Sequence, residues 1–180
     1  LADQLKIAVL AERNASIEPY IDTIPAEYTA EHARADTQLI TEFSTSFKSA
    51  TYGKANRVFN IAKAAELIDG TTIAPGEEFD MNAILGPRNA ENGWKEATGI
   101  RDAVYVQEYG GGVCQVSSTL YNAVLMADLR VTDRTHHSWP LGYVDIGRDA
   151  TISTGGPNFK FQNTQEVPIT IGAQTDKEKK

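Results

Sequence analysis

The chain has 180 residues, with 17 Lys and Arg against 24 Asp and Glu, so its net charge is −7 at pH 7. Its hydrophobic content of 41% and charged content of 23% are ordinary for a globular protein. The negative charge argues against a general nucleic-acid-binding protein, which needs a basic face, and more weakly against binding to anionic lipid. We therefore expect a globular domain with no nucleic-acid partner.

Cysteine and histidine are scarce, which limits metal and redox chemistry. Cys114 is the only cysteine, so an internal disulfide and a CxxC metal site are both excluded. A zinc site built on Cys114, His136 and His137 would need a further ligand, and adjacent strand residues rarely both reach one ion. We expect no metal and no cofactor.

Targeting signals are not visible in this sequence. No apolar run approaches the roughly 20 residues of a transmembrane helix. Because the sequence begins at Leu1 and not at Met, we expect it to be a piece of a longer protein. Any contact with a membrane would then come through segments outside this chain.

Residues 1–40 differ in pattern from the rest of the chain. A short apolar stripe in 1–10 is followed by a stretch over 15–24 that we expect to be extended. Glu18 and Ile24 each precede a proline there, and a residue before proline disfavours helix. A capped turn is predicted at 28–33. We interpret 1–40 as the remnant of a preceding domain with its linker, 41–174 as the main domain, and 175–180 as a polar tail.

Two helices are predicted in the main domain. Apolar residues share one face over 56–68, and Asp69-Gly70 ends that helix. A second apolar face defines a helix over about 114–128. Strands are predicted at 43–47, 103–109, 130–135, 141–145, 150–154, 159–162 and 167–171, with extended chain at 71–79 and a loop at 86–94. The predicted fold class is α+β, with a mostly antiparallel sheet and two core helices.

The second helix begins at a chemically informative place. Gly110, Gly111 and Gly112 lead directly into its first residues, which include Cys114. A helix N-terminus carries unpaired N–H groups and positive potential, which lower the pKa of a thiol and can hold an oxyanion. The alternatives are that Cys114 is a small buried hydrophobic residue or that the glycines form a phosphate loop, although the lysine of that motif is missing.

A cysteine nucleophile needs a base, and the sequence offers His136 and His137, followed by Asp149. Neighbouring strand residues point in opposite directions, so only one of the histidines can face Cys114. Asp149 could orient that histidine or simply end a strand. Arg148 could bind a substrate carboxylate or be a solvated charge.

These segments resemble the VanW domain family. The resemblance covers about 41–172, and its most specific segment is Gly110-Gly111-Gly112-Val113-Cys114-Gln115-Val116-Ser117-Ser118-Thr119-Leu120-Tyr121-Asn122. Further matches are Phe43-x-Thr45-x-Phe47, Arg57-x-x-Asn60-Ile61-x-x-Ala64-Ala65-x-x-Ile68-Asp69-Gly70, Pro75-Gly76-Glu77-x-Phe79-x-x-Asn82, Gly86-Pro87-Arg88, Arg134-x-x-His137-Ser138 and Asp149-Ala150-Thr151. Residues 1–40 resemble the end of the peptidoglycan-binding-like domain that often precedes VanW domains.

The resemblance implies a cysteine-dependent L,D-transpeptidase that cross-links peptidoglycan stem peptides, in a family named after vancomycin-resistance clusters. Cys114 would be the nucleophile, His137 the base and Asp149 its orienting group. We expect contacts with the stem peptide from Gly112, Gln115, Ser117 and Ser118. We also expect Arg88 or Arg148 to bind a carboxylate of the stem peptide. We expect a monomer acting outside a bacterial cell, at the wall or the cell surface.

Two other functions remain open from the sequence. An L,D-carboxypeptidase or endopeptidase would use the same acyl-enzyme with water as acceptor. A non-catalytic module would bind peptidoglycan or stem peptides and use Cys114 only for packing.

Overall fold

The computed structural model describes residues 37–47, 55–101 and 104–176. Everything described below from Ile40 onwards belongs to one compact unit, Ile40–Lys180. The predictions for 1–10, 15–24 and 28–33 fall outside the described residues.

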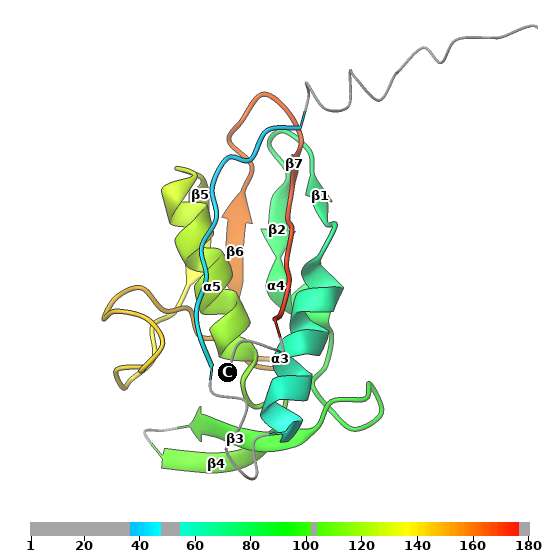
Figure 1. Ribbon diagram of the computed structural model, residues 1–180, viewed down its shortest axis with the longest axis vertical. Helices are drawn as coiled ribbons and strands as arrows, with labels where there is room; N and C mark the ends of the chain where they lie inside the picture. Colours follow the sequence, from blue (N-terminus) through cyan, green and yellow to red (C-terminus); the bar gives the residue numbers. More distant parts are fainter. Residues whose placement is uncertain (1–36, 48–54, 102–103, 177–180) are drawn as a thin grey trace, which may run out of the picture. The chain divides into compact units, whose positions relative to one another are not determined.

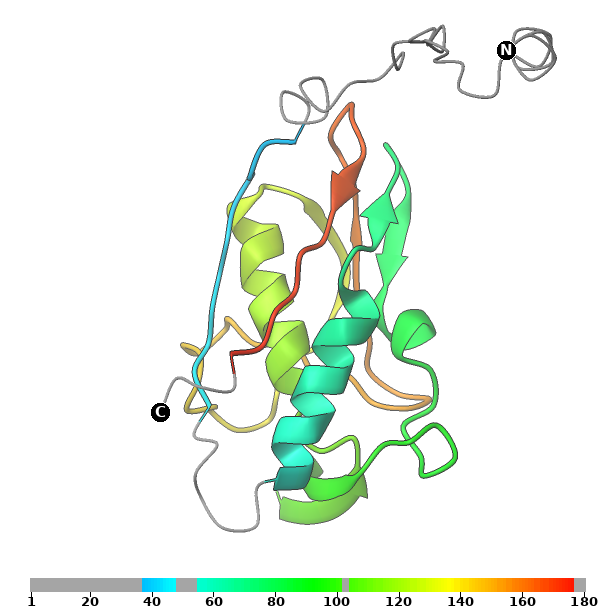
Figure 2. The same ribbon diagram turned by 45° about the vertical axis from the view of Figure 1, so that its right-hand side comes forward.

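Two helices form one side of the domain. They are α3 (Ala55–Ile68) and α5 (Val113–Met126), which pack against each other (Figures 1 and 2). Both were predicted from their apolar faces. A short third helix, α4 (Met81–Leu85), was not predicted. It begins at Asp80, whose carboxylate accepts a hydrogen bond from the main chain of Ala83 and so caps the first turn.

The strands form three small sheets, and every pairing is antiparallel. A three-stranded sheet has the order β2-β6-β5, a two-stranded sheet pairs β1 with β7, and β3 and β4 form a hairpin. The bounds are β1 (Thr72–Ile73), β2 (Glu78–Asp80), β3 (Glu96–Arg101), β4 (Val104–Tyr109), β5 (Arg130–Arg134), β6 (Phe159–Gln162) and β7 (Ile169–Thr170). The predicted α+β class with two core helices is confirmed.

Three predicted strands are wrong, and β3 was missed. Residues 43–47 and 150–154 are extended but pair with no strand, because their polar groups bind side chains of α5 instead. Residues 141–145 form turns that continue to a left-handed Gly147. Alternating apolar residues predict a half-buried extended chain, but they do not say whether a hydrogen-bonding neighbour lies beside it.

The core lies between the helices and the sheets. Phe79 and Phe161 stack with ring centroids 4.9 Å apart, and Phe159 packs on Phe161 at 5.9 Å. Each fully buried phenylalanine contributes about 1.5–3 kcal/mol through removal of its apolar surface from water. This core meets α5 at Val116 and Val124, which fixes the helix so that its N-terminus faces the hairpin and the loop between β5 and β6.

Candidate active site

The glycine turn before α5 makes room for two arginine side chains. Gly110 and Gly112 have φ values of 81° and 107°, which side chains rarely tolerate. A Cβ atom on Gly110 would lie 2.7 Å from Cγ of Arg88, and one on Gly112 would lie 2.7 Å from Cγ of Arg57. Gly112 therefore packs closely against Arg57, and its expected contact with substrate stays a prediction.

Cys114 lies in the first turn of α5 and is partly exposed. Its thiol donates a hydrogen bond to the carbonyl of Ile152, with 3.4 Å between sulfur and oxygen. Burial raises the pKa of the thiol, the charges of Glu108 and Asp149 raise it further, and Arg88 lowers it. The expectation of a lowered pKa is wrong for the resting site, because loss of hydration outweighs the helix N-terminus.

His137 is held by Asp149. The ring Nδ1 lies 2.6 Å from Oδ2 of Asp149, and the main-chain N–H of His137 donates to the same oxygen. Because a carboxylate only accepts hydrogen bonds, Nδ1 carries a proton, and in the neutral ring Nε2 therefore keeps its lone pair. The two side chains are 7% and 9% exposed, whereas His136 is exposed. Of the two histidines, His137 is therefore the one oriented as a base.

Arg134 fixes the other edge of Asp149. Its Nη2 lies 3.1 Å from Oδ1 of Asp149, and its Nε donates to the main-chain oxygen of Asp149 at 2.7 Å. Burial alone would raise the pKa of Asp149, but hydrogen bonds from the main chain and ring of His137 outweigh it and lower the pKa. Asp149 is thus a fixed anion between an arginine and an imidazole.

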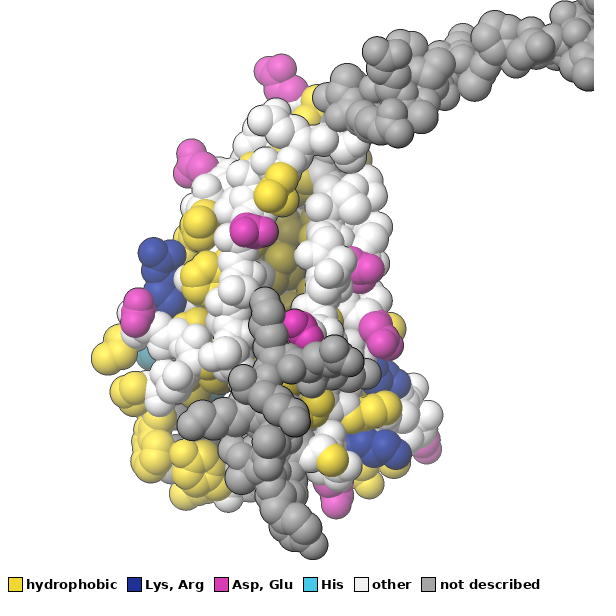
Figure 3. Space-filling view, in the orientation of Figure 1, with side chains coloured by type: hydrophobic (Ala, Val, Ile, Leu, Met, Phe, Trp, Pro, Cys, Tyr) yellow, Lys and Arg dark blue, Asp and Glu magenta, His cyan; other side chains and the backbone are white. Residues whose placement is uncertain are grey.

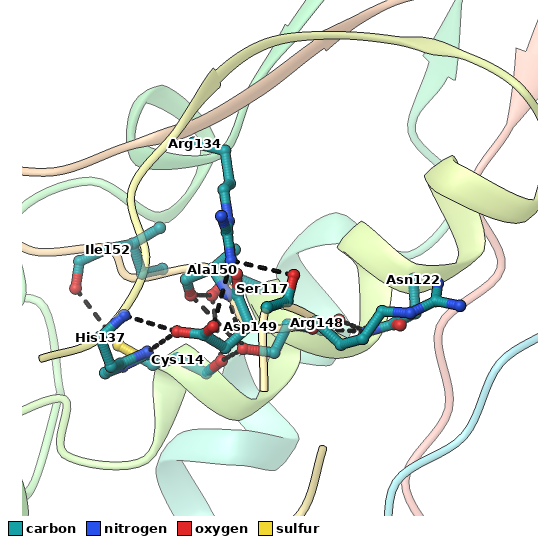
Figure 4. A network of polar contacts seen from close by, with 11 residues as sticks. Cys114, Ser117, Asn122, Arg134, His137, Arg148, Asp149, Ala150 and Ile152 are labelled. Carbon is teal, nitrogen blue, oxygen red and sulfur yellow. Dashed lines mark hydrogen bonds and ion pairs between the residues drawn. The ribbon is translucent and has the colours of Figure 1, made fainter. Parts of the chain in front are cut away.

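One short segment connects the thiol with the imidazole (Figure 4). Asp149 binds His137 at its beginning, and Ile152 accepts the hydrogen bond of Cys114 at its end. Between them, Ala150 is bound by two serines of α5. In Figure 4 the thiol of Cys114 and the ring of His137 lie at the same end of this network. Among the described residues, no hydrogen bond joins the thiol and the ring directly.

Ser117 and Ser118 are structural parts of that segment. Ser117 Oγ donates to the carbonyl of Ala150 at 2.6 Å, and Ser118 Oγ accepts from the main chain of Ala150 at 3.0 Å. Both serines are 0% exposed, so they offer no surface to a ligand. The sequence analysis assigned both serines to substrate contact; in the structure their hydroxyl groups bind Ala150 and so position the Asp149–Ile152 segment.

Gln115 is also buried, at 2% exposure, and works as a clamp. Its Oε1 accepts a hydrogen bond from Nη2 of Arg57 at 2.6 Å, and its Nε2 donates to Thr45 Oγ1 and to the carbonyl of Ser46. Gln115 therefore holds Arg57 and the extended 40–47 segment on α5. Both polar atoms of the Gln115 side chain are thus hydrogen-bonded inside the protein, whereas the sequence analysis assigned this residue to substrate contact.

The two arginines predicted to bind a carboxylate have different surroundings. Arg88 is 9% exposed; its Nη1 donates to the carbonyl of Gly86, while its Nη2 is buried without a hydrogen-bond partner. Arg148 is exposed, and Figure 4 shows its side chain extending away from Cys114. Only Arg88 is at the site, with an unmet donor.

The sequence did not single out Arg57 or Tyr143 as site residues. Burial, and after it the nearby Cys114, raises the pKa of the Tyr143 hydroxyl, which hydrogen-bonds with Ser118. Burial lowers the pKa of Arg57, while Tyr143 and Cys114 act in the opposite direction. Arg57 belongs to the family motif, so the sequence pointed to this residue but did not indicate what it does. Tyr143 falls within the wrongly predicted strand 141–145 and gave none.

A pocket of about 310 Å³ opens beside His137. The loop between β5 and β6 supplies its lining, together with the end of β5. Within the described parts of the chain, no group of three or more His, Cys, Asp and Glu side chains is placed to hold a metal ion. Over the same residues, no helix has the length and apolar character needed to cross a membrane.

Comparisons with known proteins define the family. The family described as VanW like protein matches residues 56–180, so the chain belongs to the VanW family. The uncharacterized protein YoaR of Bacillus subtilis is 40% identical over 142 residues, covering 79% of this chain and 46% of YoaR. The vancomycin B-type resistance protein VanW of Enterococcus faecalis is 30% identical over 129 residues, covering 69% of this chain and 47% of that protein.

The chain spans about half the length of these curated relatives. No solved structure matches it. Membership of the family was predicted from the cysteine motif and is confirmed.

Proposed function

We propose that the domain is a cysteine-dependent L,D-transpeptidase that joins peptidoglycan stem peptides outside a bacterial cell. The observation that carries this proposal is the pairing of His137 with Asp149 on the same short segment that binds the Cys114 thiol. A nucleophile, an oriented base and a fixed anion are the parts that acyl transfer through a thioester needs. The name of the Enterococcus relative connects that protein with vancomycin resistance, and we extend the connection to wall chemistry.

The first half-reaction forms the acyl-enzyme. The thiol leaves the carbonyl of Ile152, and its sulfur attacks the carbonyl of the L-centre in a donor tetrapeptide while Nε2 of His137 takes the proton. We assign the oxyanion to the main-chain N–H of Cys114, because the N–H groups of Val113 and Gln115 donate to the carbonyls of Gly110 and Gly112. His137 then gives the proton to the leaving amine, and D-alanine departs as the C–N bond breaks. Because the resting thiol has a raised pKa, proton removal accompanies attack and no stable thiolate precedes it.

The second half-reaction releases the acyl group. An amine of a second stem peptide attacks the thioester, the C–S bond breaks, and His137 moves one proton from the nitrogen to the sulfur. Asp149 remains an anion and stabilises the imidazolium that forms in each half-reaction.

The surroundings of Arg88 support a donor that carries a carboxylate. The Nη2 group of Arg88 is buried and without a partner, and a guanidinium binds a carboxylate through two parallel hydrogen bonds. The terminal carboxylate of a stem tetrapeptide would meet this need beside the nucleophile.

One observation favours a second candidate, a non-catalytic module that binds stem peptides. The Cys114 thiol is hydrogen-bonded to Ile152 and has a raised pKa, as an inert packing cysteine would. An L,D-carboxypeptidase would share the acyl-enzyme and differ only in its acceptor.

Intact mass spectrometry distinguishes these functions. The protein is incubated with a disaccharide-tetrapeptide, and we expect a mass increase equal to the donor minus D-alanine. Cys114 is the only cysteine, so Cys114→Ala must abolish a thioester adduct. Binding of the donor by both proteins with no adduct on the parent would support the binding module. Cross-linked dimers among the products indicate a transpeptidase, whereas released tripeptide alone indicates a carboxypeptidase.

A further inference from the structure

The pocket beside His137 is separate from the two arginines. His137 and Asp149 are among its lining residues, whereas Cys114, Arg57 and Arg88 are not. The base therefore borders two environments. On one side are the thiol of Cys114 and the guanidinium groups of Arg57 and Arg88, and on the other is the pocket of about 310 Å³.

Most of the pocket wall is apolar. Trp139, Pro140, Leu141, Val144 and Ile146 line it. Trp139 is 46% exposed and Ile146 is 86% exposed. Tyr105 of β4 contacts Trp139 edge to face, with ring centroids 6.3 Å apart, which supports the indole from outside. Figure 3 shows apolar side chains gathered at the end of the domain where Figure 1 places β4. Large apolar groups exposed together mark a binding surface.

The charges of the pocket favour a cationic guest. Arg134 lines it, but its charge is balanced by Asp149 at 3.1 Å. Asp145 adds an exposed carboxylate to the lining, while the side chain of Arg148 extends away from the site. A guest with an apolar stem and an amino end matches both the wall and this carboxylate.

We propose that this pocket binds the acceptor of the transfer reaction, an aliphatic chain that ends in a primary amine, such as the side chain of a diamino acid in a second stem peptide. The assignment rests on the proposed function. The amine loses its extra proton to solvent, its nitrogen forms the new C–N bond with the thioester carbon, and the C–S bond breaks. His137, which lines the pocket, takes one of the two remaining protons from the nitrogen and delivers it to the sulfur of Cys114, and the other proton stays on the new amide.

The test measures acylation and acceptor use separately. The donor is a disaccharide-tetrapeptide, and the acceptor probe is Nα-acetyl-lysine. Acylation is followed by intact mass, and the acyl-enzyme's partition between water and the amine is followed by chromatography of the products. Ile146→Lys places a positive charge at the pocket, and Val167→Lys is the matched control, because it adds the same charge at an exposed residue outside the pocket lining. Ile146 is 86% exposed and Val167 is 62% exposed, so both variants retain the fold.

Ile146→Lys is expected to lower the ratio of amine transfer to hydrolysis about fivefold through like-charge repulsion, with acylation unchanged. Val167→Lys should change the ratio by less than about twofold. Val144→Trp, which fills the pocket, should lower the ratio further. If Ile146→Lys and Val144→Trp acylate normally and keep the parent's ratio, the assignment of the pocket to the acceptor is wrong, while the proposed function stands. The assignment is also wrong if only these variants lose acylation, because the pocket would then bind the donor. Absence of any adduct on the parent would overturn the proposed function and this assignment together.

Discussion

Replacing Asp149 by Asn tests the orientation of the base, because the amide cannot satisfy both of its neighbours. One carboxylate oxygen accepts from Arg134 at 3.1 Å, and the other accepts twice from His137. An amide has one acceptor oxygen and one NH₂ donor. If its oxygen faces His137, the NH₂ meets the guanidinium of Arg134. If its oxygen faces Arg134, the NH₂ meets the main-chain N–H of His137, and the ring must present Nδ1 without its proton.

The cost follows from these contacts. The variant loses at least one charge-assisted hydrogen bond, worth about 1.5–3 kcal/mol, and leaves one buried donor unsatisfied, which costs about 1–3 kcal/mol. We expect a loss of about 3 kcal/mol in the free energy of unfolding, measured by urea denaturation. In the second arrangement, the His137 proton moves to Nε2, which can then no longer accept the proton of Cys114. Acylation by the tetrapeptide donor should therefore fall by about 10²–10⁴-fold.

Asp133→Asn is the matched control, since Asp133 is exposed and lies on β5 beside Arg134. It should change neither the stability nor the acylation rate noticeably. If Asp149→Asn destabilised the domain but acylated within about threefold of the parent, Asp149 would be a structural anion and the orientation of His137 would not matter for the reaction.

Four further predictions concern the thiol, the glycine turn, the α4 cap and the donor carboxylate. Alkylation of Cys114 by iodoacetamide should rise with pH through an inflection above the ordinary thiol value of about 8.5, because burial raises its pKa; an inflection below neutral pH would contradict this. Gly112→Ala should lower the free energy of unfolding by about 2 kcal/mol or more, since its φ is 107° and the new Cβ would press on Arg57; an unshifted urea midpoint would show that the turn relaxes freely. Hydrogen bonds outweigh burial at Asp80 and lower its pKa to about 2, so its stabilisation is complete above the unfolded value of about 3.9 and is lost as the pH falls towards 2. Because Asn caps a helix about as well as Asp, Asp80→Asn removes only the charge at the helix N-terminus and the ion pair with Lys160, which should cost about 0.5–1 kcal/mol at neutral pH and progressively less in acid; a cost that did not vary with pH would argue against the charge. Arg88→Met should raise the KM for a tetrapeptide donor about tenfold or more, while Cys114 should still be alkylated by iodoacetamide at a pH above its inflection, which the loss of the Arg88 charge moves further up; an equal effect on a donor with an amidated C-terminus would show that Arg88 does not bind the carboxylate.

Local patterns predicted the helices well, because a helix face is encoded by residues three and four apart. The same pattern placed Cys114 in the first turn of α5, as observed. The alternation of apolar and polar residues in 141–145 led to the prediction of a strand that does not form. A strand also needs a hydrogen-bonding partner, which lies far away in the sequence and which the local pattern does not reveal. Residues 141–145 instead form turns, and Tyr143 from this stretch comes close to Ser118 and Cys114.

The site was partly predictable for the same reason. The pairing of His137 with Asp149 could be anticipated from residue types and from a family motif. The burial of Ser117 and Ser118 could not, because adjacency to Cys114 does not tell which side of the helix meets the Asp149–Ile152 segment. Nor did the sequence show that the glycines serve Arg57 and Arg88, since these contacts join residues far apart in the chain.

Under the proposed function, different parts of the chain hold the reacting groups and select the molecules that reach them. The Asp149–Ile152 segment does the first of these. His137 and Asp149 stand 12 residues apart and are fixed by direct contacts with each other, with Arg134 and with α5. The loop between them carries most of the pocket wall. Its contacts with Arg134 and α5 are made by the carbonyls of Gly147 and Arg148 and by the side chain of Tyr143, and the apolar side chains that line the pocket are not among them. Substitutions or changes of length in that loop can therefore alter which molecules are admitted while the reacting groups keep their geometry. Under the proposed function, variation in this loop would change the partner of the reaction and leave its chemistry the same.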